Sequence, residues 1–346
     1  MSSAADYRED DTLTRRVPSR SRRRVGEAIW IGLLGTSVLL ILAILFVILG
    51  DVIFNGVGHV TWEFITQSPR MGLTEGGIYP AIVGTTILVL LMTIAAVPLG
   101  VATAVYLHEY TPPETPRQAW ARFRSSVGAE KNKAMRTWIM SVLAAVTRTA
   151  VANLAGVPSI VFGLFGLGFF IQFVGRGMDK AMHGGELVWG QGNLLWAALT
   201  LALLTLPTVI VATEEALRTV APDLRAASIA LGATRWETIR RIVLPGALPG
   251  ILTGGILGIS RGAGEVAPIL FTGAAYYLPY LPERLHNQFM HLGYHVLILS
   301  TQSPDVEATK PVLYGTVFVL LVLTFLLNLA GVLLRARTRS RMRLGG

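Results

Sequence analysis

The residues from Glu214 to Pro245 read EEALRTVAPDLRAASIALGATRWETIRRIVLP and form a polar segment between two apolar runs. The run before it, Leu187 to Thr213, contains no Asp, Glu, Lys or Arg, and neither does the run that overlaps its end, Ile242 to Ser260. A helix that rises 1.5 Å per residue needs roughly 20 apolar residues to cross the hydrocarbon of a bilayer. The segment therefore reads as a loop between two transmembrane helices.

The same pattern of long apolar runs continues along the chain, of which 52% is hydrophobic and only 15% charged. The run that begins at Ile242 continues past its first charges to about Phe271. Backbone groups in lipid must be satisfied within the segment, which favours helices. The sequence predicts an all-α integral membrane protein with six transmembrane helices, of which the other four are Ala28 to Gly50, Ile78 to Leu107, Thr149 to Val174, and Pro311 to Leu334.

The basic residues are distributed unevenly between the loops. The segments that are cytoplasmic under the positive-inside rule carry 23 Lys and Arg, and the alternate loops carry 5. This asymmetry predicts a multi-pass protein with both termini in the cytoplasm. Because the charges flank apolar runs, the formal net charge of +9 points to membrane topology and not to nucleic acid.

These features divide the chain into five parts. We expect a disordered basic segment, a first span with an external loop, a core of spans two to five, a second external loop, and a sixth span with a basic tail. The corresponding ranges are 1–26, 27–77, 78–275, 276–310 and 311–346. Within the core, residues 111–137 form a basic insert for which the sequence suggests no role.

The segment from Glu214 to Pro245 carries its own signals for the start and end of a helix. Pro222 at the first helical position and Asp223 in the first turn favour a helix start, and Gly232 permits a sharp turn. Pro245 is expected to keep a continuous helix from running into the fifth span.

The spacing that follows this helix start is specific. It is similar to the EAA loop of binding-protein-dependent ABC importers, which has Glu-Ala-Ala, three residues, Gly, nine residues, Ile, one residue and Leu-Pro. Ala226 stands where that pattern has Glu. The resemblance implies a coupling helix at about 222–241 that docks on an ATPase subunit, through Leu224, Arg225, Ala226, Ala227, Gly232, Ala233, Thr234 and Trp236.

Three further stretches resemble the A-type permease subunits of phosphate importers: Gly76 to Thr85, Asn153 to Leu167 and Ser260 to Leu270. The resemblance implies the type I ABC importer permease fold in a bacterial cytoplasmic membrane. It also implies a C-type second permease, a dimer of ATP-binding cassette ATPases and an extracytoplasmic phosphate-binding protein. No phosphate-binding loop sequence occurs in this chain, so ATP and Mg are expected on the ATPase, with no cofactor or metal bound here.

The fifth predicted span carries two features. Glycines recur every fourth residue, which is typical of close helix packing in lipid; they are Gly250, Gly254, Gly258 and Gly262. Arg261 and Glu265 are spaced i, i+4, and charges at this depth are costly. They are either a self-neutralising pair that fixes packing, or an anion path in which Glu265 holds Arg261. Arg148 is compatible with a place in the path or with snorkelling to the headgroups.

Other interpretations stay open at this stage. The cargo could be another oxyanion such as sulfate or molybdate, and a secondary carrier driven by an ion gradient is a more distant alternative. His291 and His295 lie i, i+4 in the second external loop, near several tyrosines. Two histidines are too few for a metal site, so we expect this loop to be a surface for the binding protein.

Overall fold

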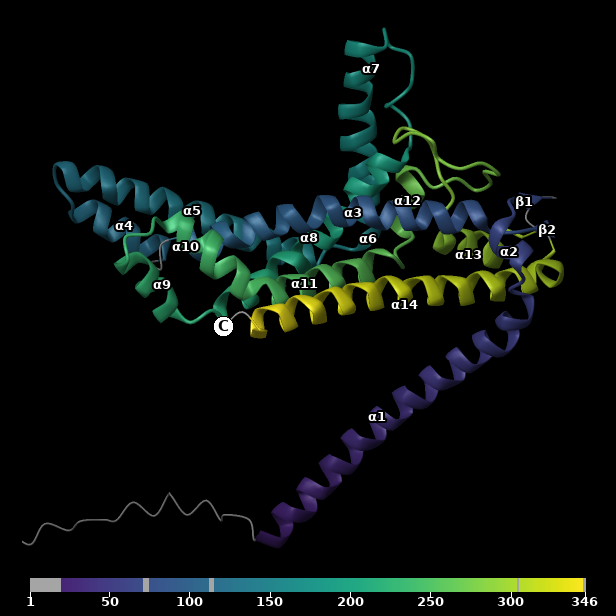
Figure 1. The fold of residues 1–346 in the computed structure, drawn as a ribbon, viewed down its shortest axis with the longest axis horizontal. Helices are drawn as coiled ribbons and strands as arrows, with labels where there is room; N and C mark the ends of the chain where they lie inside the picture. Colours follow the sequence, from purple (N-terminus) through teal and green to yellow (C-terminus); the bar gives the residue numbers. More distant parts are fainter. Residues whose placement is uncertain (1–19, 71–74, 112–114, 304, 345–346) are drawn as a thin grey trace, which may run out of the picture. The chain divides into compact units, whose positions relative to one another are not determined.

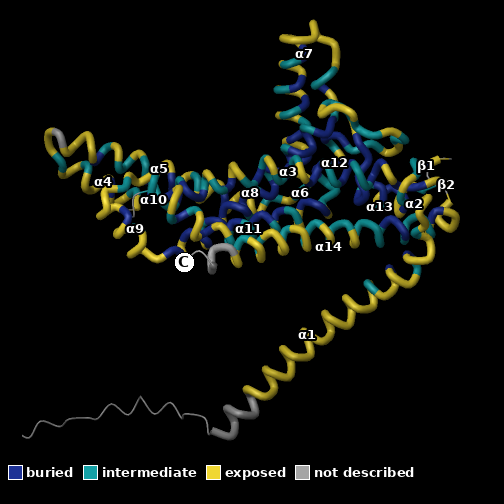
Figure 2. The backbone as a smooth tube through the Cα atoms, viewed as in Figure 1, coloured by how far each residue is buried: buried dark blue, intermediate teal, exposed yellow. Residues whose placement is uncertain are grey.

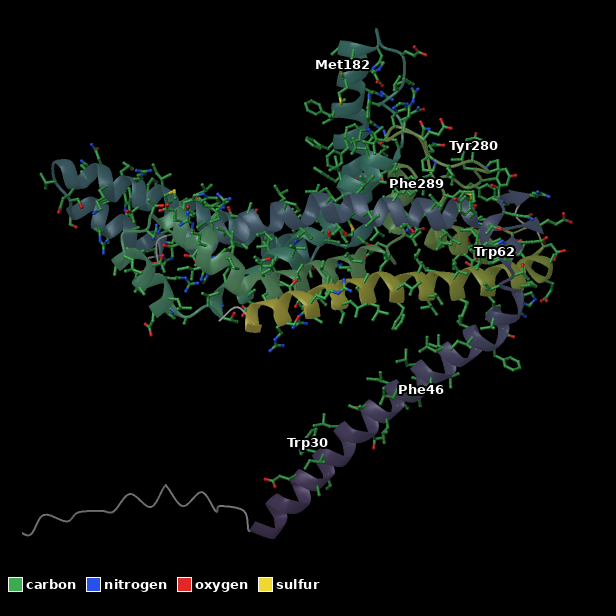
Figure 3. The ribbon with its side chains drawn as sticks, in the orientation of Figure 1. Trp30, Phe46, Trp62, Met182, Tyr280 and Phe289 are labelled. Atoms are coloured by element: carbon green, nitrogen blue, oxygen red, sulfur yellow. The ribbon has the colours of Figure 1, made fainter. Side chains whose placement is uncertain are left out.

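The computed structural model describes residues 20–70, 75–111, 115–303 and 305–344 (Figure 1). The chain divides into two units, Met1–Phe54 and Asn55–Gly346, and each is described by itself. The first contains most of helix α1 (Arg20–Gly56), whose apolar stretch has a mean hydropathy of 2.9. Trp30 and Phe46 extend from opposite halves of this helix (Figure 3). Of the expected disordered segment 1–26, residues 1–19 lie outside the described part, and the rest belongs to α1.

The transmembrane, all-α architecture predicted from the sequence is confirmed. Among the described residues, seven helical segments are long and apolar enough to cross a membrane, where the sequence predicted six. They are Glu27–His59, Tyr79–Tyr110, Glu130–Ala155, Ser159–Met182, Leu194–Arg218, Arg235–Gly262 and Val306–Ser340.

The additional segment arises from the third predicted span. In place of one helix over 149–174, α5 (Ala129–Ala155) ends and α6 (Ser159–Phe165) begins after a break at Gly156–Pro158. Pro158 is extended and precedes α6 because a proline ring blocks a continuing helix. The apolar part of α5 starts only after the charged residues of the insert, and it contains Arg148. Because of this charge, the part of α5 before Thr149 was not predicted as a span.

The basic insert forms a helical hairpin. α4 (Pro116–Ser125) is capped by reciprocal hydrogen bonds between Thr115 and Gln118, and it packs against the first part of α5. The ring centroids of Trp120 and Trp138 lie 5.2 Å apart across the two helices. The insert is therefore an ordered extension of α5.

Four long helices make up the body of the second unit. α3 (Tyr79–Val105), α8 (Leu194–Arg218), α11 (Leu244–Gly262) and α14 (Val306–Leu344) run alongside one another (Figure 1). α8 contacts both α3 and α11, and α11 contacts α14. α8 is the most buried candidate span, and Figure 2 shows the buried residues concentrated along this centre. The remaining faces are apolar and exposed, as helices in lipid require.

The short elements of this unit form groups at its two ends and one group that projects from its side. α4, α9 (Pro222–Ala230), α10 (Arg235–Thr238) and the C-terminal end of α14 lie at one end (Figure 1). The opposite end carries the other short elements, which are α2 (Trp62–Thr66), β1 (Pro69–Arg70), β2 (Glu75–Gly76) and α13 (Leu292–Thr301). The third such group projects sideways and consists of η4 (Gly166–Gly175) and α7 (Arg176–Met182), with α12 (Ala267–Thr272) at its base. We call the end that holds α9 the loop end.

The segment that decided the fold forms two helical pieces. Pro222 is at the start of α9, and Gly232 adopts a φ of +90° in the turn to α10, both as expected. Pro245 does not stop the helix, contrary to expectation. A π-helical turn, η5 (Ile239–Val243), joins α10 to α11 without a break, and the wider turn gives the proline ring the room that an α-helix denies it.

Candidate functional site

The helix α9 presents most of its surface to solvent at the loop end. Only the side chains of Arg225 and Ser228 turn inward, one turn apart, and every other residue of α9 is exposed. Leu224 is 54% exposed and Ile229 55%, although both are apolar. The helix therefore has an inner polar edge and an outer apolar face.

The turn after α9 extends this outer face. Leu231 is 89% exposed and Trp236 55% exposed, and Gly232 and Ala233 lie between them. Thr234 and Glu237 cap α10 through reciprocal hydrogen bonds, which fix the direction of the helix that carries Trp236. The Ser228 and Thr238 hydroxyl oxygens lie 2.9 Å apart and connect α9 to α10.

Arg225 connects α9 to two other helices. Its Nη1 donates to the Val220 carbonyl at 2.9 Å and its Nη2 to the Leu217 carbonyl at 2.8 Å, both at the end of α8. Nη2 also lies 3.2 Å from Oε1 of Glu109, in the π-helical turn η3 (Tyr106–Tyr110) that ends α3. The side chains of Arg225 and Glu109 are only 20% and 12% exposed.

Arg148 lies near this cluster and not near Arg261. Its Nη2 donates to the Leu107 carbonyl at 3.0 Å, and its Nε lies 3.9 Å from Oε1 of Glu214. The residue also borders a largely apolar cavity of about 550 Å³ between α5, α8 and α11, whose lining includes Pro207 and Leu257. The structure thus separates Arg148 from the other two residues of the expected anion path.

The second charged pair lies where α11 ends. Nε of Arg261 is 3.8 Å from Oε1 of Glu265, and the two side chains are 42% and 23% exposed. Glu265 lies in the short turn between α11 and α12, so the helix is interrupted beside the pair. Broken helices of this kind supply polar backbone and side chains to a path within the membrane.

The four glycines of the stripe all lie at helix contacts. A Cβ added at Gly250 would overlap that of Ala216, and one added at Gly254 would lie 2.8 Å from the Ala212 Cβ. A Cβ added at Gly258 would meet Val209 on α8. One added at Gly262 would meet Met92 on α3 and Thr205 on α8. Along this face, α8 approaches α11 more closely than side chains would permit.

The histidines of the second external loop are inside the protein, contrary to expectation. His291 is 0% exposed and His295 2% exposed. Nδ1 of His291 accepts from the Gly293 N–H at 3.1 Å. Burial lowers the pKa of His291 to about 3 and that of His295 to about 4, so both are neutral. The exposed part of the loop includes Tyr276, Tyr277 and Tyr280, of which Tyr280 is 65% exposed (Figure 3).

Sequence reasoning missed two residues of the cluster at the loop end. Glu109 and Glu214 are nearly buried carboxylates, each beside an arginine from another helix. Glu214 directly follows one charge-free run and Glu109 follows another after His108, and that position is the signal that could have identified them. Within the described residues, no group of three or more His, Asp or Glu is arranged to hold a metal ion.

Curated relatives resemble this chain over most of its length. It is 30% identical over 322 residues to the probable ABC transporter permease protein YqgI of Bacillus subtilis, covering 89% of this chain and 94% of that protein. It is 33% identical over 331 residues to the phosphate transport system permease protein PstA 1 of Mycobacterium tuberculosis, covering 94% and 93%. Against PstA of Mycobacterium leprae the identity is 36% over 270 residues, or 75% of each chain.

A structural match and a family match complete the comparison. The methionine ABC transporter MetNI, in an inward-facing conformation, has a chain that aligns with a TM-score of 0.49 and 16% identity, covering 75% of this chain and 94% of that one. Residues 129–343 match the model of the family described as binding-protein-dependent transport system inner membrane component. The chain therefore belongs to this family of importer permeases in the inner membrane.

Proposed function

We propose that this chain is the permease subunit of an ATP-driven phosphate importer, in which it forms half of the transmembrane pathway. Phosphate as the cargo is supported by the mycobacterial relatives, whose names give phosphate transport and whose similarity extends over most of both chains. Sulfate and molybdate remain the alternatives to exclude by experiment.

The observation that carries the mechanism is the apolar outer face of α9 and α10. Leu224, Ile229, Leu231 and Trp236 are each more than half exposed, at the end of the bundle where the helices beyond the spans collect. Under the positive-inside rule this end is cytoplasmic, because the basic insert and the basic tail of α14 lie there. Exposed apolar residues in water favour a protein partner.

The partner of this face is the ATP-binding cassette ATPase dimer. ATP and Mg are held on that dimer, and its closure displaces α9 as a rigid helix. A C-type second permease supplies the other half of the pathway, and a phosphate-binding protein delivers the cargo on the opposite side. Both termini of this chain are cytoplasmic in this arrangement, in agreement with the distribution of Lys and Arg.

In the pathway, Arg261 is the residue that meets the anion. A guanidinium presents a planar fork of donors that fits two phosphate oxygens, and the Nε of Arg261 lies 3.8 Å from Oε1 of Glu265. The partial exposure of both side chains leaves Arg261 able to exchange this carboxylate for an anion.

Labelled uptake tests the cargo and the energy source together. In cells that lack their own copy, this chain with its partner subunits is expected to restore phosphate uptake that depends on ATP and resists excess sulfate. Competition by sulfate or molybdate would indicate the other oxyanions. Uptake by this chain alone in liposomes, driven by an ion gradient, would indicate a secondary carrier instead.

A charge on the outer face tests the docking. Leu231→Glu is expected to abolish co-purification of the ATPase, because a carboxylate would be desolvated in an apolar contact. Val127→Glu is the matched control, since Val127 is 84% exposed in the turn between α4 and α5. Equal recovery of the ATPase with both variants would rule out α9 as the docking helix.

A further inference from the structure

We propose that Arg225 is the positioning residue that joins α9 to α3 and α8, so that displacement of α9 reaches two spans through one guanidinium. The inference rests on the proposed function, in which α9 docks on the ATPase. It goes beyond that function because docking alone does not specify how a small surface helix moves the bundle.

The helix α9 has few attachments to the rest of the unit. Between Pro222 and Ala230, Arg225 and Ser228 are the only side chains that are not exposed, and Ser228 contacts Thr238 of α10. The following turn contains Gly232 at a positive φ. Arg225 is therefore the side chain of α9 that ties this helix to α3 and α8, whereas Ser228 ties it to the continuous helix of α10 and α11.

The end of α8 is the first partner of Arg225. The last carbonyl groups of a helix have no partner within it and carry partial negative charge. Leu217 lies in the last turn of α8 and Val220 just beyond it, and both carbonyls accept hydrogen bonds from Arg225. The guanidinium thus caps α8 from a neighbouring helix, and the two ends move together.

The end of α3 is the second partner of Arg225. The carboxylate of Glu109 is 12% exposed, and a carboxylate this buried requires a nearby positive charge. The Nη2 atom of Arg225 supplies it at 3.2 Å, whereas Nε2 of His108 is 3.9 Å from the same oxygen. Separating α9 from α3 would leave Glu109 without its counter-charge, so the pair resists separation.

The contacts of Arg225 require an arginine side chain. One planar group reaches two carbonyls and one carboxylate in different directions, which the single ammonium of lysine cannot reproduce. The contact is also independent of the position where the importer pattern has Glu. Ala226 is exposed on the outer side of α9, while its neighbour Arg225 faces the spans.

The experiment measures phosphate transported per ATP hydrolysed, in proteoliposomes that contain the complete importer and its binding protein. We expect Arg225→Gln to lower this ratio at least tenfold and Arg225→Lys to lower it less. Arg218→Gln is the matched control, because Arg218 is 58% exposed and pairs on the surface with Glu215 at 3.3 Å. The ratio is measured on purified, assembled complexes, so a lower yield of folded complex alone would leave it unchanged.

The absence of cysteine from this chain permits a second test. Glu109→Cys and Arg225→Cys together should lower the ratio, and a short bifunctional thiol reagent that is reversible by reduction should restore it. Glu109→Cys alone, treated in the same way, controls for modification.

The proposal is overturned if Arg225→Gln keeps the ratio within twofold of the unaltered importer, or if cross-linking restores nothing. Failure of the proposed function would look different, since the unaltered complex would then show no ATP-dependent phosphate uptake.

Discussion

Two Arg–Glu pairs in this chain have opposite designs. Arg225 and Glu109 come from different helices, are at most 20% exposed, and are fixed by two further hydrogen bonds to carbonyls. Arg261 and Glu265 are close in sequence, 3.8 Å apart and more exposed. The first pair is built to hold two elements together, whereas the second is loose enough to exchange partners.

The difference shows why pairing alone does not identify a role. A buried pair between elements is costly to break, because removing one partner leaves an unpaired charge. The pair of Arg261 and Glu265 joins no distant elements and is partly exposed, which leaves its charges available. The surroundings of each pair, more than its residue types, decide between a mechanical and a ligand-binding role.

The largest expected effect comes from the loose pair. Arg261→Gln should lower phosphate uptake by roughly 100-fold, since it removes charge-assisted hydrogen bonds to the anion. Glu265→Gln should lower uptake less, because the guanidinium remains. Labelled uptake normalised to the amount of assembled importer measures both. Unchanged uptake in the Arg261 variant would show that the pair of Arg261 and Glu265 only fixes helix packing. The two Arg–Glu pairs would then not differ in role.

The next effect sharpens the picture of a rigid loop end. Gly250→Ala places a methyl group against Ala216, and overpacking of this kind costs about 1–3 kcal/mol. The thermal midpoint of the detergent-solubilised chain should therefore fall. Gly255→Ala is the control, since its Cβ would lie at an ordinary 3.5 Å from Val97. Equal midpoints for the two variants would mean that α8 and α11 separate easily.

A smaller effect concerns the protein behind the loose pair. Gly293, two residues after His291, packs against Val266, the residue after Glu265. The pKa of His291 and His295 is lowered to about 3 and 4 from 6.5, so the unfolded chain binds more protons below pH 6.5. Stability should be fully present above pH 6.5 and fall as the pH drops towards 4. Thermal midpoints at pH 7.5 and 5 should differ by at least about 3 °C.

Replacement of the buried histidine separates this effect from general acid sensitivity. His295→Leu should reduce the dependence of stability on pH, because leucine does not titrate. The replacement loses no hydrogen bond, since neither ring nitrogen of His295 has a partner. His59→Gln should leave the dependence unchanged, since His59 is exposed. An identical slope in all three proteins would exclude the buried histidines as its origin.

The smallest effect tests the outer side of α9. Ala226→Glu restores the residue that the importer pattern has at this position, and we expect the ratio of phosphate to ATP to change less than twofold. The reason is that Ala226 is exposed and the connection to the spans passes through Arg225. A large gain would show that docking, and not the Arg225 pair, limits coupling.

The sequence was sufficient for the class of fold and for the start of α9. Long charge-free runs and the signals at Pro222 and Gly232 are local, and local patterns survive in the structure. Gly156 and Pro158 lie inside a continuous apolar run, so the end of α5 at this point was not predicted. Arg148 concealed the helix before it, because one charge ended the apolar run.

The candidate sites were less predictable because they depend on contacts between distant segments. Arg225 and Glu109 are more than a hundred positions apart, so spacing could not pair them. His291 and His295 were expected on a surface because they lie in a loop between spans, but that loop folds back into the unit. The i, i+4 pair of Arg261 and Glu265 was predictable because a single turn brings it together.

The π-helical turn η5 has a consequence for register. An extra residue in one turn advances the helix face by about 100° without breaking the rod. The inserted residue therefore fixes the angle, about the helix axis, between the start of α10 at Thr234 and the glycine stripe of α11 that includes Gly250. Deleting one residue from 239–243 would rotate Trp236 away from its present direction relative to α11. The direction of the proposed docking surface relative to the bundle thus depends on one residue in this turn.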